Sequence, residues 1–522
     1  MDLLAGLRGD LGMRRFGVGM ARLDEHWAGA RRLEPKHPDA AGLLCYIAQW
    51  VDAGWRDIYV VQDSLGAFPK GRRLKLNLMD YAYVLMAEGV VWVAEENLDK
   101  ALANFSLVLS LRTEIGDPLV LALAHFWSSR CNRKAGEYDA ALSHAGAGHR
   151  YATEAGMEPM AATMRVAESW LLFQKGKLRD ALKLLGEADA VLRETDDYIT
   201  RGNIQSGYGR MYRREGRYDL GLRHFSQAIE EYGKRDPEHR NLARSLANMG
   251  YVERLIALQL RKRIDADAAQ RRRSQPDIRR DYENMRAQAL AHLDRAGEIY
   301  ALHSNHRGAG TVCVNRGHLH LDSGDLQKAD DEARQGYKLG EEKNDYILMA
   351  RARLLECMVE NTKLDEEIED PAWVAHLALE AAKEAVELSR RTQNRRLLAR
   401  ALIWHGLTIC STSTGSLDAA RDLSEQAAAL LKNEVQDHIW EDLQLLKARA
   451  VQGGNLDAKL HAWSQGIVGE RSFQQLTDDF ADLIIPKVWE HENRKVARVS
   501  KRLSISPKKV RRVLARLGLH GV

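Results

Sequence analysis

The sequence predicts an all-α protein, a superhelical solenoid of paired helices followed by a small helix-turn-helix domain. Three observations predict this architecture. The chain has 522 residues and only 10 prolines, which favours long helices because proline breaks a helix interior. Small and aromatic residues recur with a period of about 34 residues through most of the chain. From Asn493 to Val522 there are ten Lys or Arg and no Asp or Glu, which indicates a polyanionic partner for the C-terminus.

The composition is typical of a soluble globular protein, with 45% hydrophobic and 29% charged residues and a net charge of +4. No apolar run is long enough for a secretory signal or a membrane span, so no membrane partner is expected. The cysteines are scattered, odd in number and never spaced as CxxC, which indicates buried free thiols in a reducing, cytoplasmic compartment. They are Cys45, Cys131, Cys313, Cys357 and Cys410.

Residues 1–38 are expected to form an N-terminal helical cap, and the repeats follow from Asp39. The segment from Ile204 to Tyr232 shows one repeat most clearly. In this repeat a small residue lets the first helix approach the second closely, a glycine ends the first helix in a turn, and aromatic side chains fill the space between neighbouring hairpins. The residues in these positions are Gly209, Tyr212, Gly216, Tyr218, Gly221, Phe225 and Ala228.

The same frame recurs on both sides of this segment. The copies contain Gly89, Trp92, Ala101 and Phe105; Gly136, Tyr138 and Ala141; Gly176, Leu178, Ala181, Leu185 and Ala188; Gly317, Gly324, Leu326 and Ala329; and Trp404, Leu407, Gly415, Leu417, Ala420 and Ala427. Less regular copies cover Leu43 to Ser64 and Tyr346 to Gln393. This pattern resembles tetratricopeptide repeat arrays and implies about eight or nine helical hairpins between residues 39 and 451. An unrelated helical bundle is the alternative.

One copy is interrupted by an Arg-rich insertion near residues 253–286. Gly250 is expected in the first helix of this copy, but the matching small residue of the second helix is Ala289, much further along the chain than the pattern requires. The insertion contains Pro276. Lengthened helices joined by a solvated loop explain it, and a second nucleic-acid contact is the alternative.

Basic residues lie on the outward positions of the first helices, which line the concave surface of such arrays. A groove of this kind favours an acidic peptide, a protein partner or the chain's own acidic segments, although charges on a solenoid face also serve solvation alone. The Lys and Asn carboxylate clamp known in this family is not reproduced. The candidate groove residues are Arg130, Arg133, Lys134, Arg210, Arg213, Arg214 and Arg254.

Residues 452–476 break the repeat pattern and are expected to form a linker. The helix-turn-helix domain then covers residues 477–522. Apolar residues Val499, Leu503 and Ile505 would pack against Val510 and its helical neighbours Val513, Leu514 and Leu517. Ser506 before Pro507 is a typical helix start. The serine hydroxyl accepts a hydrogen bond from a free backbone N–H of the first turn, and proline, which has no N–H, leaves no hydrogen bond unmade at that position.

The segment SKRLSISPKKVRRVLARLGL resembles the C-terminal DNA-binding domain of the Fis family. The resemblance implies a double-stranded DNA partner and a homodimer. Ser504 stands where the family has a turn glycine, so we expect it at positive φ, at a penalty of about 1 kcal/mol. The predicted contacts to DNA bases and phosphates are Lys495, Arg498, Lys501, Arg502, Ser506, Lys508, Lys509, Arg511 and Arg512.

We find none of the common catalytic or nucleotide-binding motifs GxxxxGK[ST], GxSxG, HExxH and GxGxxG in the chain. His318, His320 and Asp322 do not predict a metal site, because residues two apart point to different sides of a helix. We therefore expect that the protein is not an enzyme and that it binds no cofactor or metal. The sequence predicts a DNA-binding transcriptional regulator whose array binds a partner or self-associates. The alternative is a scaffold whose basic tail docks or binds nucleic acid without specificity.

Overall fold

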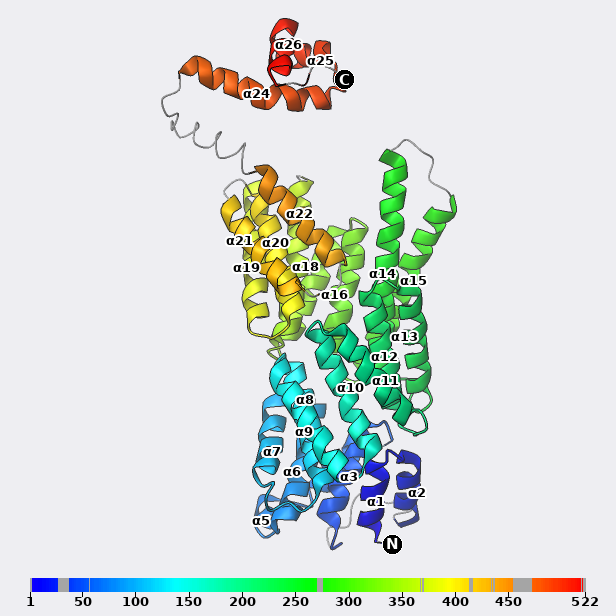
Figure 1. The fold of residues 1–522 in the computed structure, drawn as a ribbon. Helices are drawn as coiled ribbons and strands as arrows, with labels where there is room; N and C mark the ends of the chain where they lie inside the picture. The colour runs from blue at the N-terminus through cyan, green and yellow to red at the C-terminus, as the bar shows by residue number, and fades with distance from the viewer. Residues whose placement is uncertain are drawn as a thin grey trace.

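A computed structural model of the chain confirms the predicted all-α class. It describes residues 2–26, 37–55, 57–269, 276–366, 370–412, 416–432, 437–453 and 472–517, together with Ile368, Glu434 and Leu519. All regular secondary structure in these ranges is helical. Figure 1 shows the helices stacked side by side along the chain as an extended solenoid.

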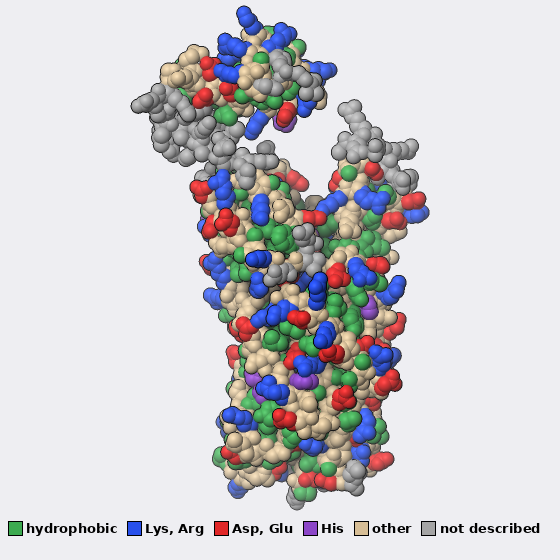
Figure 2. All heavy atoms as spheres, viewed as in Figure 1, with side chains coloured by type: hydrophobic (Ala, Val, Ile, Leu, Met, Phe, Trp, Pro, Cys, Tyr) green, Lys and Arg blue, Asp and Glu red, His purple; other side chains and the backbone are tan. Residues whose placement is uncertain are grey.

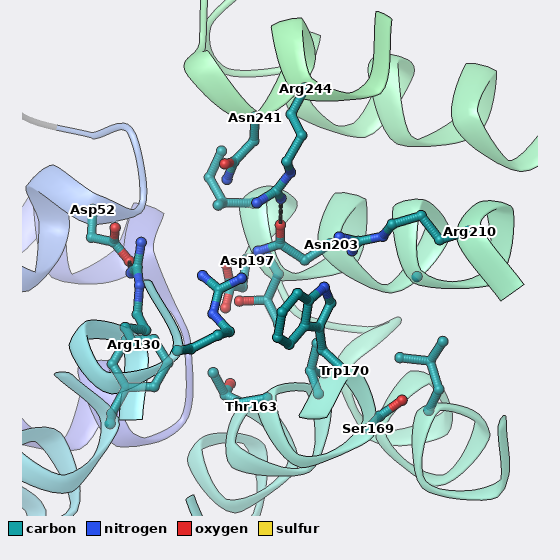
Figure 3. A pocket seen from close by; sticks show the side chains of 18 of the residues that line it. Asp52, Arg130, Thr163, Ser169, Trp170, Asp197, Asn203, Arg210, Asn241 and Arg244 are labelled. Carbon is teal, nitrogen blue, oxygen red and sulfur yellow. Dashed lines mark hydrogen bonds and ion pairs between the residues drawn. The ribbon is translucent and has the colours of Figure 1, made fainter. Parts of the chain in front are cut away.

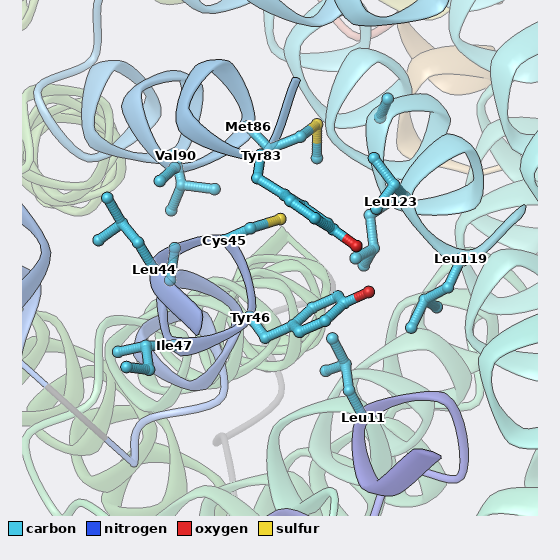
Figure 4. Packing of buried hydrophobic residues seen from close by; sticks show 14 of the residues in the cluster. Leu11, Leu44, Cys45, Tyr46, Ile47, Tyr83, Met86, Val90, Leu119 and Leu123 are labelled. Carbon is cyan, nitrogen blue, oxygen red and sulfur yellow. The ribbon is translucent and has the colours of Figure 1, made fainter. Parts of the chain in front are cut away.

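The N-terminal helices cover the first end of the solenoid. They are α1 (Leu3–Gly12), α2 (Phe16–His26), α3 (Ala40–Asp52), α4 (Ile58–Leu65) and α5 (Lys70–Arg73). α3 is almost completely buried between α1 and the first repeat helices, and Tyr46 packs edge-on against Tyr83 with ring centroids 5.7 Å apart (Figure 4). The Tyr46 hydroxyl donates to the Asp117 carboxylate at 2.5 Å, which fixes this end to the repeats.

Eight consecutive helical hairpins follow in the described ranges, and a single helix, α22 (His438–Gly453), packs after the last of them. The hairpins are α6 (Leu78–Ala94) with α7 (Leu98–Ser110), α8 (Pro118–Ala135) with α9 (Tyr138–Glu154), α10 (Glu158–Gln174) with α11 (Leu178–Leu192), α12 (Tyr198–Arg214) with α13 (Tyr218–Gly233), α14 (Arg240–Ala269) with α15 (Pro276–Leu302), α16 (His306–Asp322) with α17 (Leu326–Glu341), α18 (Tyr346–Asp365) with α19 (Pro371–Arg390), and α20 (Arg395–Ser411) with α21 (Leu417–Leu431).

The predicted repeat positions have the expected physical roles. Gly216 lies between α12 and α13 at φ +76°, a conformation that favours glycine because it has no Cβ. A Cβ on Gly221 would meet the backbone oxygen of Gly209 at 3.3 Å, and a Cβ on Gly209 would meet the ring of Phe225 at 2.8 Å. Small residues therefore allow the two helices of the hairpin to pack at short range.

The interrupted copy forms the longest hairpin. α14 has 30 residues and α15 has 27, so the Arg-rich insertion extends both helices beyond their neighbours (Figure 1). A Cβ on Gly250 would meet the backbone oxygen of Ala289 at 2.9 Å, which shows the close approach expected from this pair. The segment between the two helices lies outside the described residues, as does most of the predicted linker between Gly453 and Ser472.

Distant repeats contact one another because the solenoid winds back toward its own earlier helices. The backbone N–H of Gln393 donates to the Gly136 carbonyl at 2.9 Å, and the Tyr251 hydroxyl lies 3.2 Å from the His438 ring. Segments from the first and second halves of the chain are thus in direct contact.

Candidate functional site

The C-terminal unit is a three-helix domain with its own small core. It consists of α24 (Phe473–His491), α25 (Val496–Leu503) and α26 (Pro507–Arg516). Val499, Val510 and Leu514 are fully buried against Ile485 and Trp489 of α24. Apart from Leu517, which is 40% exposed, the apolar residues chosen from their helical spacing thus bring α25 and α26 together on the supporting helix.

The turn between α25 and α26 has the predicted geometry. Ser504 is left-handed, with φ 51° and ψ 39°, and the Ser500 hydroxyl donates to the Ile505 carbonyl at 2.5 Å. The Ser506 hydroxyl accepts from the backbone N–H of Lys509 at 3.2 Å, with Pro507 in the first helical turn. Ser506 therefore caps the second helix and fixes its direction.

The basic residues of this unit form an exposed face. Exposed side chains at Lys495, Arg498, Lys501, Lys508, Arg511 and Arg512 make no ion pair with any described residue, and Lys509 is half-buried. Arg502 lies 2.6 Å from the Glu492 carboxylate, and Arg516, outside the predicted set, pairs with Asp482 of α24. Figure 2 shows Lys and Arg side chains gathered over this unit. The free cations give it a surface suited to phosphates.

The structure places the seven predicted groove residues in three different environments. Arg214 and Arg254 are buried and serve packing: Arg254 forms a two-point ion pair with Asp322, with one contact of 2.9 Å. Arg213 donates to the Asn248 side chain at 2.9 Å. Lys134 is in a third kind of environment, where burial, followed by the positive charge of Arg240, lowers its pKa to about 7. Arg130, Arg133 and Arg210 alone of the seven line a pocket on the concave side.

This lumenal pocket lies between the first helices of successive repeats, α8, α10, α12 and α14 (Figure 3). It encloses about 890 Å³ free of protein atoms, counting the part open to solvent. Five arginines and two aspartates line it, and the two aspartates are already paired. Asp197 accepts from Arg14 at 2.7 Å, and Asp52 pairs with Arg130. The remaining three are Arg133, Arg210 and Arg244.

Three arginines of the pocket have no carboxylate partner among the described residues. The Arg133 guanidinium lies 4.9 Å from the ring centre of Trp170, Arg210 donates to the Ser206 carbonyl at 3.1 Å, and Arg244 donates to the Asn203 side chain at 2.6 Å. Burial, followed by the charge of Arg244, lowers the pKa of Arg133 to about 9 and lowers the pKa of Arg210 well below its usual value. The three charges therefore repel one another in a shared space.

Sequence reasoning missed Arg14, Trp170, Asn203, Asn241 and Arg244, which complete the pocket. One signal was available: Asn203, Gly207 and Arg210 follow one helical face at the spacing i, i+4, i+7, as do Asn241 and Arg244 at i, i+3. The pairing of Asp52 and Asp197 with arginines of other elements could not be read from this spacing, because the partners come from distant segments.

No family model matches the chain, and no curated protein matches it. The chain is similar to several solved structures. A Rap protein complexed with competence and sporulation factor is 13% identical, with a TM-score of 0.50 over 79% of this chain and 99% of that chain. The human IFIT1 dimer with m7Gppp-AAAA is 16% identical, with a TM-score of 0.48 over 84% of this chain and 87% of that one. A signal transduction ATPase with a tetratricopeptide repeat sensor, from Pyrococcus horikoshii, is 13% identical, with a TM-score of 0.40 over 88% and 66% of the two chains.

At 13% identity, the likeness to the Rap protein shows the fold alone. The array is a tetratricopeptide-like helical solenoid, as its repeat frame predicts. In the described ranges, no helix is long and apolar enough to cross a membrane. In the same ranges, no group of three or more His, Cys, Asp or Glu side chains is arranged to hold a metal ion.

Proposed function

We propose that this chain is a helical-repeat binding protein whose C-terminal helix-turn-helix domain binds duplex DNA. The observation that carries the proposal is the exposed basic face of α25 and α26, where six cations are free of ion pairs and follow a turn of helix-turn-helix geometry. Lys508, Arg511 and Arg512 on α26 would enter the major groove, and Lys495, Arg498 and Lys501 would contact phosphates beside it. The Fis-like dimer on two half-sites, about one helical turn apart, is part of this proposal.

The array supplies the partner-binding half of the proposed function. A Rap protein of the same fold is known in complex with competence and sporulation factor, which supports the use of such a solenoid to bind a protein or peptide. Arg133 and Arg210 on the concave side have no carboxylate partner in the described part of the chain, so an anionic group of a partner would be favoured there. Binding in the array would then control the terminal domain of a transcriptional regulator.

A salt titration of duplex binding tests the DNA-binding half. The logarithm of the affinity should fall linearly with the logarithm of the salt concentration, and each lost phosphate contact should reduce the slope by about 1. We expect Lys501→Ala to reduce the slope and weaken binding to all duplexes equally. Arg223→Ala, an exposed arginine of α13, is the matched control and should leave the slope unchanged. Equal slopes in both variants and the wild type would refute the contact.

A scaffold is the second candidate, favoured by the solenoid fold itself, since the array makes up most of the chain. In that case the basic unit would dock on a protein or bind nucleic acid without sequence preference. The two candidates differ in one observable, the preference among duplexes of different sequence at a fixed salt concentration.

A further inference from the structure

We propose that the lumenal pocket is a binding site for a phosphorylated ligand, with Arg133, Arg210 and Arg244 holding the phosphate. This inference goes beyond the proposed function. DNA binding by the terminal domain does not require it, and it names a chemistry that an acidic peptide does not share. The first argument is charge: five arginines and two aspartates line the pocket, an excess of three positive charges.

The second argument is the lack of acceptors. Both aspartates of the pocket already accept from arginines, Asp197 from Arg14 and Asp52 from Arg130. The side-chain oxygen of Asn203 is also occupied, because it accepts from Arg244 at 2.6 Å and from the Tyr232 hydroxyl at 3.0 Å. These three side chains therefore have acceptor oxygens already in use, whereas Arg133 and Arg210 have no carboxylate acceptor, which an anionic ligand would supply.

Two donor atoms of the pocket are buried and have no acceptor within the described structure. They are Nε of Arg244 and Nε1 of the Trp170 indole. Unpaired buried donors are rare in proteins and unfavourable by themselves. They come from different helices, α14 and α10, yet line the same space (Figure 3). An oxyanion bound in this pocket would bring acceptor oxygens near both side chains.

The third argument concerns the energy of the empty pocket. Burial and mutual repulsion disfavour the charged forms of Arg133 and Arg210, and neither has a carboxylate partner among the described residues to offset this. Strong perturbation of several groups facing one cavity is typical of a functional site. An anion in the pocket would remove the repulsion, because each guanidinium can donate in a planar fork to two of its oxygens.

The charge and the donor count favour phosphate over carboxylate. A phosphate monoester carries about −1.5 to −2 charges at neutral pH and three acceptor oxygens, whereas a carboxylate carries one charge and two oxygens. Three guanidinium groups, on α8, α12 and α14, match the charge and the three oxygens of a phosphate monoester. The pocket combines aromatic with polar side chains, as small-molecule sites do, and the Trp170 indole offers a planar surface beside the anion.

Calorimetric titration of the full-length chain with pyrophosphate, at constant ionic strength, tests the proposal. We expect saturable binding to the wild type and an affinity at least tenfold lower in Arg133→Gln and in Arg210→Gln. Arg223→Gln, on the exposed surface of α13, is the matched control and should bind like the wild type. Arg511→Ala/Arg512→Ala should also bind like the wild type, which separates this pocket from the basic C-terminal unit.

Thermal unfolding of the same variants shows whether they fold. Without ligand, Arg210→Gln should unfold at or above the wild-type temperature, because a repelled charge has been removed. Pyrophosphate should stabilise the wild type, Arg223→Gln and Arg511→Ala/Arg512→Ala, but neither Arg133→Gln nor Arg210→Gln. Absence of pyrophosphate binding to the wild type, or an equal loss in Arg223→Gln, would overturn the proposal. Binding of a hexaglutamate peptide through Arg133 and Arg210 without pyrophosphate binding would also overturn it, in favour of an acidic-peptide receptor.

Discussion

The guanidinium of Arg214 and the carboxylate of Glu434, 220 positions apart in the sequence, lie 3.4 Å from each other. Arg214 ends α12, and Glu434 lies between α21 and α22. The same carboxylate is 3.3 Å from Arg396 of α20. One buried acid therefore holds cations from two distant repeats and joins successive parts of the solenoid.

Replacing this acid should destabilise the solenoid more than replacing one of its partners. Glu434→Gln leaves Arg214 charged and without a carboxylate partner in a buried place, whereas Arg396 keeps Asp437. We expect a loss of about 3 kcal/mol in the free energy of unfolding. Arg214→Met leaves Glu434 paired with Arg396 and should lose only about 1 kcal/mol. Urea unfolding of the full chain measures both.

The control for this prediction is a second Glu→Gln change at an exposed contact. Glu441 lies 2.6 Å from Lys262 and joins α22 to α14, but both side chains are more than half exposed. Glu441→Gln should change the free energy of unfolding by less than about 0.5 kcal/mol. A loss in Glu434→Gln no larger than this would contradict the role of the buried acid.

The stability of the array should decrease in acid partly because of His239. This side chain is buried, and its Nδ1 accepts from the backbone N–H of Asn241 at 3.2 Å, at the start of α14. Burial, followed by the charge of Arg240, lowers the pKa of His239 to about 3. In the unfolded chain it takes a proton near pH 6.5, so its contribution is present above that pH and lost as the pH falls toward 3.

Denaturant unfolding between pH 7 and pH 4 measures this dependence. His239 should contribute a decrease of up to about 1.4 kcal/mol per pH unit below pH 6. His239→Asn keeps a capping acceptor but takes no proton, so its profile should be flatter. His376→Asn, at an exposed position of α19, is the control. A His239→Asn profile parallel to that of the wild type would refute the assignment.

The turn of the helix-turn-helix should become more stable when Ser504 is replaced by glycine. Ser504 has φ 51°, a region that disfavours residues with a Cβ by about 1 kcal/mol. Ser504→Gly should slow hydrogen exchange of α25 and α26, whereas Ser506→Ala should accelerate it, because removal of the cap costs about 1 kcal/mol. Exchange that is faster in Ser504→Gly than in the wild type would contradict this account.

Local features of the chain were predictable because neighbours in the sequence determine them. The αL conformation of Ser504, the cap at Ser506 and the close approach of Gly250 to Ala289 all follow from backbone sterics and helical spacing. The solenoid class followed in the same way from the recurring repeat frame. These features need no information on how one repeat is oriented against the next.

The long-range contacts could not be predicted in this way. The pairing of Arg214 with Glu434 and of Arg254 with Asp322 depends on how tightly the solenoid winds, and a repeat period contains no measure of that winding. For this reason the sequence assigned both arginines to a ligand groove, whereas each has a carboxylate partner inside the protein. It also missed Arg244 and Trp170, which meet Arg133 and Arg210 only in the folded array.

The most direct test of the central claim is the selection of random duplexes by the full-length chain at about 150 mM salt, with sequencing of the retained DNA. We predict enrichment of a palindromic site whose halves lie about one helical turn apart. The enrichment should disappear in Arg511→Ala/Arg512→Ala and persist in Arg179→Ala/Arg223→Ala, which removes two exposed arginines of the array. Retention without a common sequence, equal in all three proteins, would contradict sequence-selective DNA binding and leave the scaffold as the function of this solenoid.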